Sequence, residues 1–188
     1  MAIVTATQVT QYSDISASAA TIASSGLIPM IQAKINAICN NYFTTDIYTQ
    51  GACTFSGTTI TCIGANLAGC GFAEGDEVYI YNSYRNDSYK TIGAVSGSAM
   101  TVGEAVVSEL SGASIMISLV QWPLLAQQAA AQMIKYDYDD RPNRTAGIKA
   151  HSLGPFSESF GTNEVDAQWG YPTELMDMLR PFMRARLL

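Results

Sequence analysis

The hydrophobic periodicity of this chain changes twice along its length. Between about residues 43 and 120, short runs of β-branched and aromatic residues are separated by turns rich in Gly, Ser and Asn, a pattern typical of strands. On either side of this stretch, apolar residues recur at steps of three and four, the spacing of a helix face. Within it, Val78 and Ile80 alternate with Tyr79 and Tyr81, which predicts strands buried on one side.

These patterns predict an α+β fold, in which a small helical bundle of about four helices carries an inserted antiparallel β barrel or sandwich. The helical domain is expected to comprise residues 1–42 and 120–188, and the inserted β domain residues 43–119. Residues 16–26 are expected to form a pliable connection. The expected helices run from Thr5 to Tyr12, from Leu27 to Tyr42, from Trp122 to Tyr138 and onward from Pro172, with Pro181 ending the last one.

The charge of the chain limits the classes of partner it can have. Sixteen acidic against ten basic residues give a net charge of -6, which argues against a protein whose main task is to grip phosphates. No apolar run approaches the roughly 18 to 20 residues of a membrane span, and the first residues lack the pattern of a secretory signal. We therefore expect a soluble protein that is made in the cytosol and has no membrane partner.

The cysteines and the single histidine do not form a metal-binding motif. Cys39, Cys53, Cys62 and Cys70 contain no CxxC pair, and His151 lies far along the chain. A four-residue turn from residue 56 to residue 59 would place Cys53 opposite Cys62, close enough to cross-link under oxidising conditions. In the cytosol we expect free, mostly buried thiols instead.

The sequence offers little enzyme chemistry. His151 has no second histidine and no GxSxG or HExxH motif to accompany it. The stretch from Gly69 to Gly75 has the wrong spacing for a dinucleotide-binding loop, and the acidic cluster Asp137–Asp140 lacks the glycine of a calcium loop. We therefore expect no catalytic residue, no bound metal and no cofactor.

Four tyrosines leave two interpretations open for the β domain. A sugar- or base-stacking face would use the rings of outward-facing strand residues, whereas the simpler interpretation is a set of cross-strand aromatics that stabilise a small sheet. The tyrosines are Tyr79, Tyr81, Tyr84 and Tyr89.

Two segments near the C-terminus have the composition of interaction sites. Residues 147–160 predict an extended arm or loose hairpin, whose backbone donors and acceptors a neighbouring chain could pair with. Apolar side chains and three arginines crowd into residues 180–188. Because Pro181 interrupts the last helix, the residues after it need not pack on the bundle.

These segments resemble the head-to-tail connector (adaptor, or head completion) proteins of tailed bacteriophages, in which a motif of the form G-[IV]-K-x-x-S-[LI]-G-x-[FY]-S precedes a terminal helix that opens with Tyr-Pro. The resemblance covers residues 1–42 and 120–188, and the β insert departs from the compact helical members. The matching residues are Gly147, Ile148, Lys149, Ser152, Leu153, Gly154, Phe156, Ser157, Tyr171, Pro172, Leu179, Phe182 and Arg184.

The resemblance implies a non-enzymatic virion protein at the neck, made in the host cytoplasm. It would form a ring, by resemblance a dodecamer, that contacts the portal protein and tail or tail-completion proteins and lets genomic DNA pass without specific binding. The implied portal-binding residues are Arg180, Phe182, Met183, Arg184, Arg186, Leu187 and Leu188. From the acidic cluster and the extended arm, the residues expected at a subunit interface are Asp137, Asp139, Asp140, Ile148, His151, Leu153, Phe156 and Phe160. The main alternative is a ligand-binding protein whose β insert recognises carbohydrate or a receptor, and a small hydrolase is a more distant one.

Overall fold

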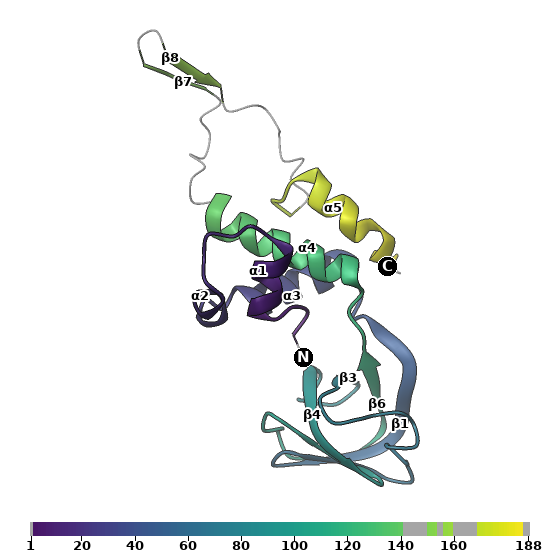
Figure 1. Cartoon of the computed structure of the whole chain (residues 1–188). Helices are drawn as coiled ribbons and strands as arrows, with labels where there is room; N and C mark the ends of the chain where they lie inside the picture. The colour runs from purple at the N-terminus through teal and green to yellow at the C-terminus, as the bar shows by residue number, and fades with distance from the viewer. Residues whose placement is uncertain (1, 141–149, 154–155, 160–168, 186–188) are drawn as a thin grey trace. The chain divides into compact units, whose positions relative to one another are not determined.

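The computed structural model describes residues 2–140, 150–153, 156–159 and 169–185 (Figure 1). The chain divides into two compact units. Residues 42–122 form one, called here the barrel unit, and residues 2–41 and 123–188 form the other, the helical unit. The chain therefore enters and leaves the barrel unit once each.

The helical unit begins with two short helices that carry side-chain caps. Helix α1 (Ala6–Tyr12) starts in a capping box between Thr5 and Gln8, which satisfies two backbone donors of its first turn. Helix α2 (Ala19–Ser24) starts at Ser18, whose hydroxyl accepts a hydrogen bond from the backbone of Thr21. The expectation of a pliable connection here is wrong, because a capped helix of six residues is too short to show a periodic apolar face.

Helix α3 (Leu27–Cys39) buries the predicted stripe but ends before Tyr42. Its last turn closes at Asn40, which has the left-handed φ of 48° common at helix C-termini. Tyr42 already belongs to the barrel unit. The buried residues of α3 are Ile31, Gln32, Ile35, Ile38 and Cys39.

The helix expected from Trp122 to Tyr138 is α4 (Leu124–Lys135), which continues into a π-helical turn, Tyr136–Asp140. Pro123 precedes the first helical residue as the N-cap, so Trp122 lies outside the helix. Three consecutive alanines in the middle of α4 are fully buried, which permits close approach of other backbones. The buried residues of α4 are Ala126, Ala129, Ala130, Ala131, Met133 and Ile134.

Helix α5 (Thr173–Leu179) is the last α-helix of the described chain. It begins after Pro172 and ends where Pro181 was expected to stop it, in a 3-10 turn, Arg180–Phe182. The inward face of α5 is formed by Met176 and Leu179.

Between α4 and α5, the described residues include a β-hairpin that pairs only with itself. Strands β7 (Ala150–Leu153) and β8 (Phe156–Ser159) form a separate two-stranded antiparallel sheet. Of the two predicted forms, an extended arm or a loose hairpin, this is the hairpin. Its register pairs Ala150 with Ser159, His151 with Glu158, Ser152 with Ser157 and Leu153 with Phe156.

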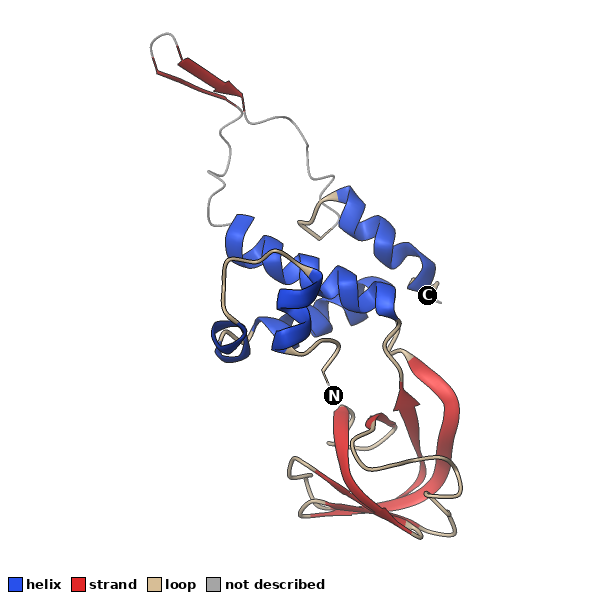
Figure 2. Cartoon of the chain, in the orientation of Figure 1, coloured by secondary structure: helices blue, strands red, loops and turns tan. Residues whose placement is uncertain are grey.

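The barrel unit consists of six antiparallel strands that close on themselves (Figure 2). Their order around the barrel is β1-β2-β5-β4-β3-β6, and β6 pairs with β1 to complete the circle. The strands are β1 (Thr44–Ser56), β2 (Thr59–Cys62), β3 (Glu77–Tyr81), β4 (Tyr89–Ser96), β5 (Ala99–Val102) and β6 (Glu109–Val120).

Local sequence signals set the β1–β2 hairpin. Ser56 pairs with Thr59 and Cys53 with Cys62, which confirms the predicted four-residue turn and its register. Gly57 occupies the turn at a φ of 62°, a conformation that side chains disfavour. The expectation of free thiols at this pair is wrong, since Cys53 and Cys62 form a disulfide, while Cys39 is free and buried and Cys70 is free and exposed.

The interior of the barrel unit is a hydrophobic cluster of buried side chains. The predicted alternation in β3 is confirmed, because Val78 and Ile80 are fully buried and Tyr79 and Tyr81 lie on the outer surface, partly covered. The cluster comprises Cys53, Phe55, Ile60, Cys62, Leu67, Phe72, Val78, Ile80, Ile92, Met100, Val102, Val106, Ile115 and Ile117.

The expected fold class is therefore wrong. The sequence argument made a helical bundle the body of the protein and the strands an insertion, whereas the described chain is a mixed α and β protein whose core is supplied mostly by antiparallel strands. The physical reason is that the six strands close on themselves and enclose an apolar interior of their own. Helices α1, α2 and α5 are short, with six or seven residues each.

Candidate functional site

The described part of the C-terminal tail, residues 180–185, folds back onto the end of α3. The backbone N–H of Arg184 donates to the carbonyl of Cys39 over 2.8 Å, and the side-chain amide of Asn41 donates to the carbonyl of Phe182 over 3.2 Å. The Cys39 carbonyl lies in the last turn of α3 and has no partner within the helix, so the tail supplies the missing donor. The expectation that residues after Pro181 need not pack on the helices is wrong for the described part of the tail.

The side chains of the tail remain largely exposed while its backbone is held. Arg180 forms an ion pair with Asp177 over 3.0 Å, but both side chains are more than half exposed, so this pair contributes little to stability. Met183 is 41% exposed, Arg184 is exposed and Phe182 is half-buried. Of the expected portal-binding residues, Arg186, Leu187 and Leu188 lie outside the described residues.

Two carboxylates of the acidic cluster after α4, those of Asp137 and Asp139, contact other residues of the helical unit. The Lys34 ammonium group on α3 lies 3.2 Å from Asp137 Oδ2 and donates to the Tyr171 hydroxyl over 2.7 Å. The Tyr171 hydroxyl in turn donates to Asp137 Oδ2 over 2.6 Å, and Tyr171 is fully buried. Because the Asp137 side chain is only 5% exposed, it ties α3 and the segment before α5 to the π-helical turn rather than facing solvent.

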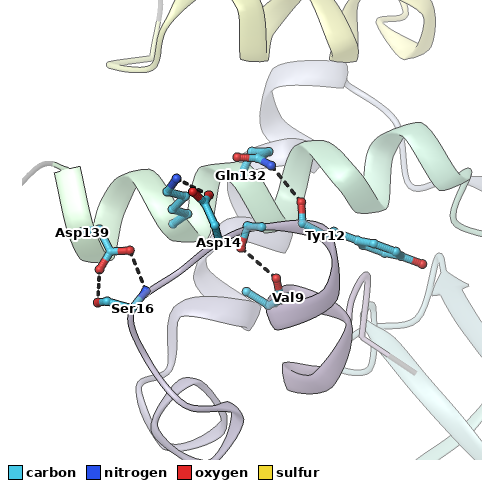
Figure 3. A network of polar contacts seen from close by, with 8 residues as sticks. Val9, Tyr12, Asp14, Ser16, Gln132 and Asp139 are labelled. Atoms are coloured by element: carbon cyan, nitrogen blue, oxygen red, sulfur yellow. Dashed lines mark hydrogen bonds and ion pairs between the residues drawn. The ribbon is translucent and has the colours of Figure 1, made fainter.

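A second contact ties the segment after α1 to the same turn (Figure 3). Both carboxylate oxygens of Asp139 accept hydrogen bonds from Ser16, one from its backbone N–H over 2.9 Å and one from its hydroxyl. One turn back, Lys135 forms an ion pair with Asp14. The hydrogen bond from Lys135 lowers the pKa of the Asp14 carboxyl and raises the pKa of the Lys135 ammonium group.

The arm expected at the subunit interface is described in its two strands. His151 and Leu153 lie on β7 and Phe156 lies on β8, while Ile148 and Phe160 lie outside the described residues. Asp140, at the end of the π-helical turn, is exposed. The interface role assigned to these residues remains a prediction.

The aromatic residues on the outer wall of the barrel pack against one another. Tyr79 stacks on Tyr42 with ring centroids 4.1 Å apart, and meets Tyr81 and Tyr89 edge-on at 4.5 and 4.9 Å. Trp122 lies 5.6 Å from Tyr89. Burial, followed by the hydrogen bond with Tyr42, raises the pKa of the Tyr79 hydroxyl above its ordinary value. These ring faces are occupied by neighbouring rings, as expected for cross-strand aromatics that stabilise a sheet.

Tyr84 is separate from this cluster and 89% exposed. The backbone of the loop that carries it is held by Glu109. The Glu109 carboxylate accepts hydrogen bonds from the backbone N–H groups of Tyr84 and Arg85 over 3.1 and 2.7 Å. Asn86, which is 4% exposed, both donates to and accepts from the backbone of Val107. The loop therefore presents Tyr84 on an ordered backbone.

Sequence reasoning missed the residues that position these candidate sites. Lys34, Asn41 and Glu109 each join segments that are more than 20 residues apart. The nearest available signal was Lys34, a single charge on an otherwise apolar helix face. The partners of such residues are distant in sequence and can be identified only from the fold.

The described residues contain no group of three His, Cys, Asp or Glu side chains arranged to hold a metal ion. None of the helices that the structure describes has the length and apolar content needed to cross a membrane. Compared with known proteins, the chain matches no family model, and no curated protein reaches significant similarity to it.

Proposed function

We propose that this protein is a structural subunit of a tailed-phage neck, which assembles as a ring between the portal and the tail and extends the DNA channel. The observation that carries the proposal is the β7–β8 hairpin, which forms a sheet of its own within the segment that resembles the connector family. A two-stranded hairpin is marginally stable alone in water. A neighbouring subunit would supply the surface that such a hairpin requires.

The portal contact belongs, in this proposal, to the C-terminal tail. Its backbone is anchored at Cys39 and Asn41, so the side chains around it are presented from a fixed position at a lower entropic cost on binding. Arg180, Met183 and Arg184 combine exposed guanidinium groups with an exposed apolar side chain, which suits carboxylates and pockets on a partner.

The charge of the chain fits a channel through which DNA passes without being held. A net charge of -6 per subunit, repeated around a ring, sets up a field that repels phosphates. The protein should therefore show no measurable binding to duplex DNA at moderate salt. Tight, salt-sensitive binding would contradict this part of the proposal.

Size-exclusion chromatography with light scattering tests the proposal. A ring has a mass that is a large multiple of the 20.1 kDa chain, either alone or when portal protein is added. A protein that stays at 20.1 kDa over a wide concentration range, and with portal present, would refute it.

A second candidate function is favoured by Tyr84. An aromatic ring that is 89% exposed on an ordered loop is suited to stacking on a sugar or a receptor side chain. This function predicts that the full chain binds host cells or surface glycans and that Tyr84→Ala removes the binding. Tyr48→Ala, at a tyrosine that is 53% exposed on β1, is the matched control.

A further inference from the structure

Among the described strands, β7 and β8 are the two that have a neighbouring strand on one side only. In the barrel unit every strand has a neighbour on both sides, because β6 returns to β1. In the hairpin, β7 has one neighbour, β8, and β8 has one neighbour, β7. The outer edge of β7 and the outer edge of β8 are therefore open along the whole strand and available for strand addition.

We infer that β8 of one copy pairs with β7 of the next copy, so that the hairpins of a ring join into one continuous antiparallel sheet. This inference rests on the proposed ring and names the partner of the arm, a second copy of the same hairpin. In the closed barrel of a neighbouring copy, by contrast, each strand already has two neighbouring strands.

Symmetry selects this pairing over the alternatives. In a cyclic ring, all copies of β7 point one way along the axis and all copies of β8 point the other way, because the two strands of each hairpin are antiparallel. Pairing β8 with the next β7 therefore continues the antiparallel order and closes head to tail. Pairing β8 with β8, or β7 with β7, in antiparallel fashion requires a two-fold axis and stops at a dimer.

The hairpin register indicates which backbone groups are available. Two residues separate Leu153 from Phe156, and in a hairpin with a two-residue loop the pair that flanks the loop exchanges its own hydrogen bonds. The pairs then alternate, so the next pair, Ser152 and Ser157, directs its N–H and C=O groups outward. Ser157 would offer the edge of β8, and Ser152 the edge of β7.

The joined sheet would itself form a barrel with twice as many strands as the ring has copies. Barrels of roughly 16 strands or more leave an aqueous channel. A ring of about eight or more copies would thus surround an open channel with hairpin backbone whose hydrogen bonds are all satisfied between copies.

Proline at the outward position tests the pairing. Ser157→Pro removes an outward N–H while leaving the bonds within the hairpin in place, and Ser157→Ala, which keeps the N–H, is the matched control. We expect wild type and Ser157→Ala to form the ring and Ser157→Pro to fall to 20.1 kDa. Unchanged circular dichroism of Ser157→Pro would show that both units remain folded.

Hydrogen exchange of the full-length ring provides the second measurement. The amides of residues 150–159 should be protected in the wild-type ring and should exchange rapidly in Ser157→Pro. If wild type is a ring, but Ser157→Pro is also a ring and these amides exchange rapidly in both, the hairpin pairing is refuted while the proposed function stands. A wild-type protein that remains at 20.1 kDa with portal present refutes both, and a wild-type dimer refutes the head-to-tail pairing.

Discussion

The disulfide between Cys53 and Cys62 should set a large share of the stability of the barrel unit. The two residues are nine apart in sequence, and a cross-link of that separation lowers the entropy of the unfolded chain by an amount worth about 2.6 kcal/mol at 25 °C. Both residues are 1% exposed or less, so a reductant reaches the bond only when the barrel opens. Reduction should therefore lower the free energy of unfolding of the barrel, and it should proceed only through molecules in which the barrel has opened.

Urea unfolding of the same protein, refolded with and without reductant, measures this effect. With a urea dependence of about 1 kcal/mol per molar for a unit of this size, the barrel transition should shift by roughly 2 to 3 M. The helical transition should move little, because neither cysteine belongs to the helical unit. Cys70→Ser, which removes an exposed free thiol, is the control and should leave both transitions unchanged.

Counting free thiols in denaturant without reductant decides the underlying assignment. The account predicts two reactive thiols, those of Cys39 and Cys70. Four reactive thiols, or a barrel transition that is insensitive to reductant, would refute the reasoning.

Three further predictions concern the helical unit. Lys34→Met removes the cation beside the buried Asp137 carboxylate and should lower the free energy of unfolding by about 3 kcal/mol in urea titrations, whereas a loss below about 0.5 kcal/mol would show that the contact is dispensable. Burial raises the pKa of the Cys39 thiol to about 11, so at pH 8 Cys70 should be alkylated and Cys39 should stay unmodified until the pH approaches that value; equal rates at pH 8 would contradict its burial. Truncation after Leu179 should abolish portal binding in a pull-down assay while both units stay folded, and full binding by the truncated chain would place the contact elsewhere.

The features that sequence predicted correctly are local. The turn between Ser56 and Thr59 follows from neighbouring residues, and so does the end of α5 before Pro181. The alternation of Val78 and Ile80 with their neighbours follows in the same way from the two-residue period of a strand. Such signals require no knowledge of the remaining chain.

The features that sequence missed depend on segments brought together by folding. Nothing near Pro181 indicates that Arg184 will donate to the end of α3, because the acceptor is the backbone of Cys39. The acidic neighbours of Asp137 likewise do not indicate that its side chain is buried against Lys34 and Tyr171. Charge along a sequence does not reveal which carboxylates fold inward.

The same limit explains why the sequence did not indicate how much of the core each unit supplies. The apolar stripe of a helix can be recognised within a short window of sequence, whereas the closure of β1 onto β6 pairs residues more than 50 apart. Without that closure the strands could belong to a barrel, a sandwich or an open sheet. The sequence alone therefore does not show that the strands enclose a core of their own.

Adding the protein to purified portal and measuring the mass and shape of the product by native mass spectrometry and electron microscopy tests the central claim most directly. The account predicts a single ring of this protein stacked on the portal, with the axes of the two assemblies aligned. A folded protein that remains a free 20.1 kDa chain beside an undecorated portal would contradict it.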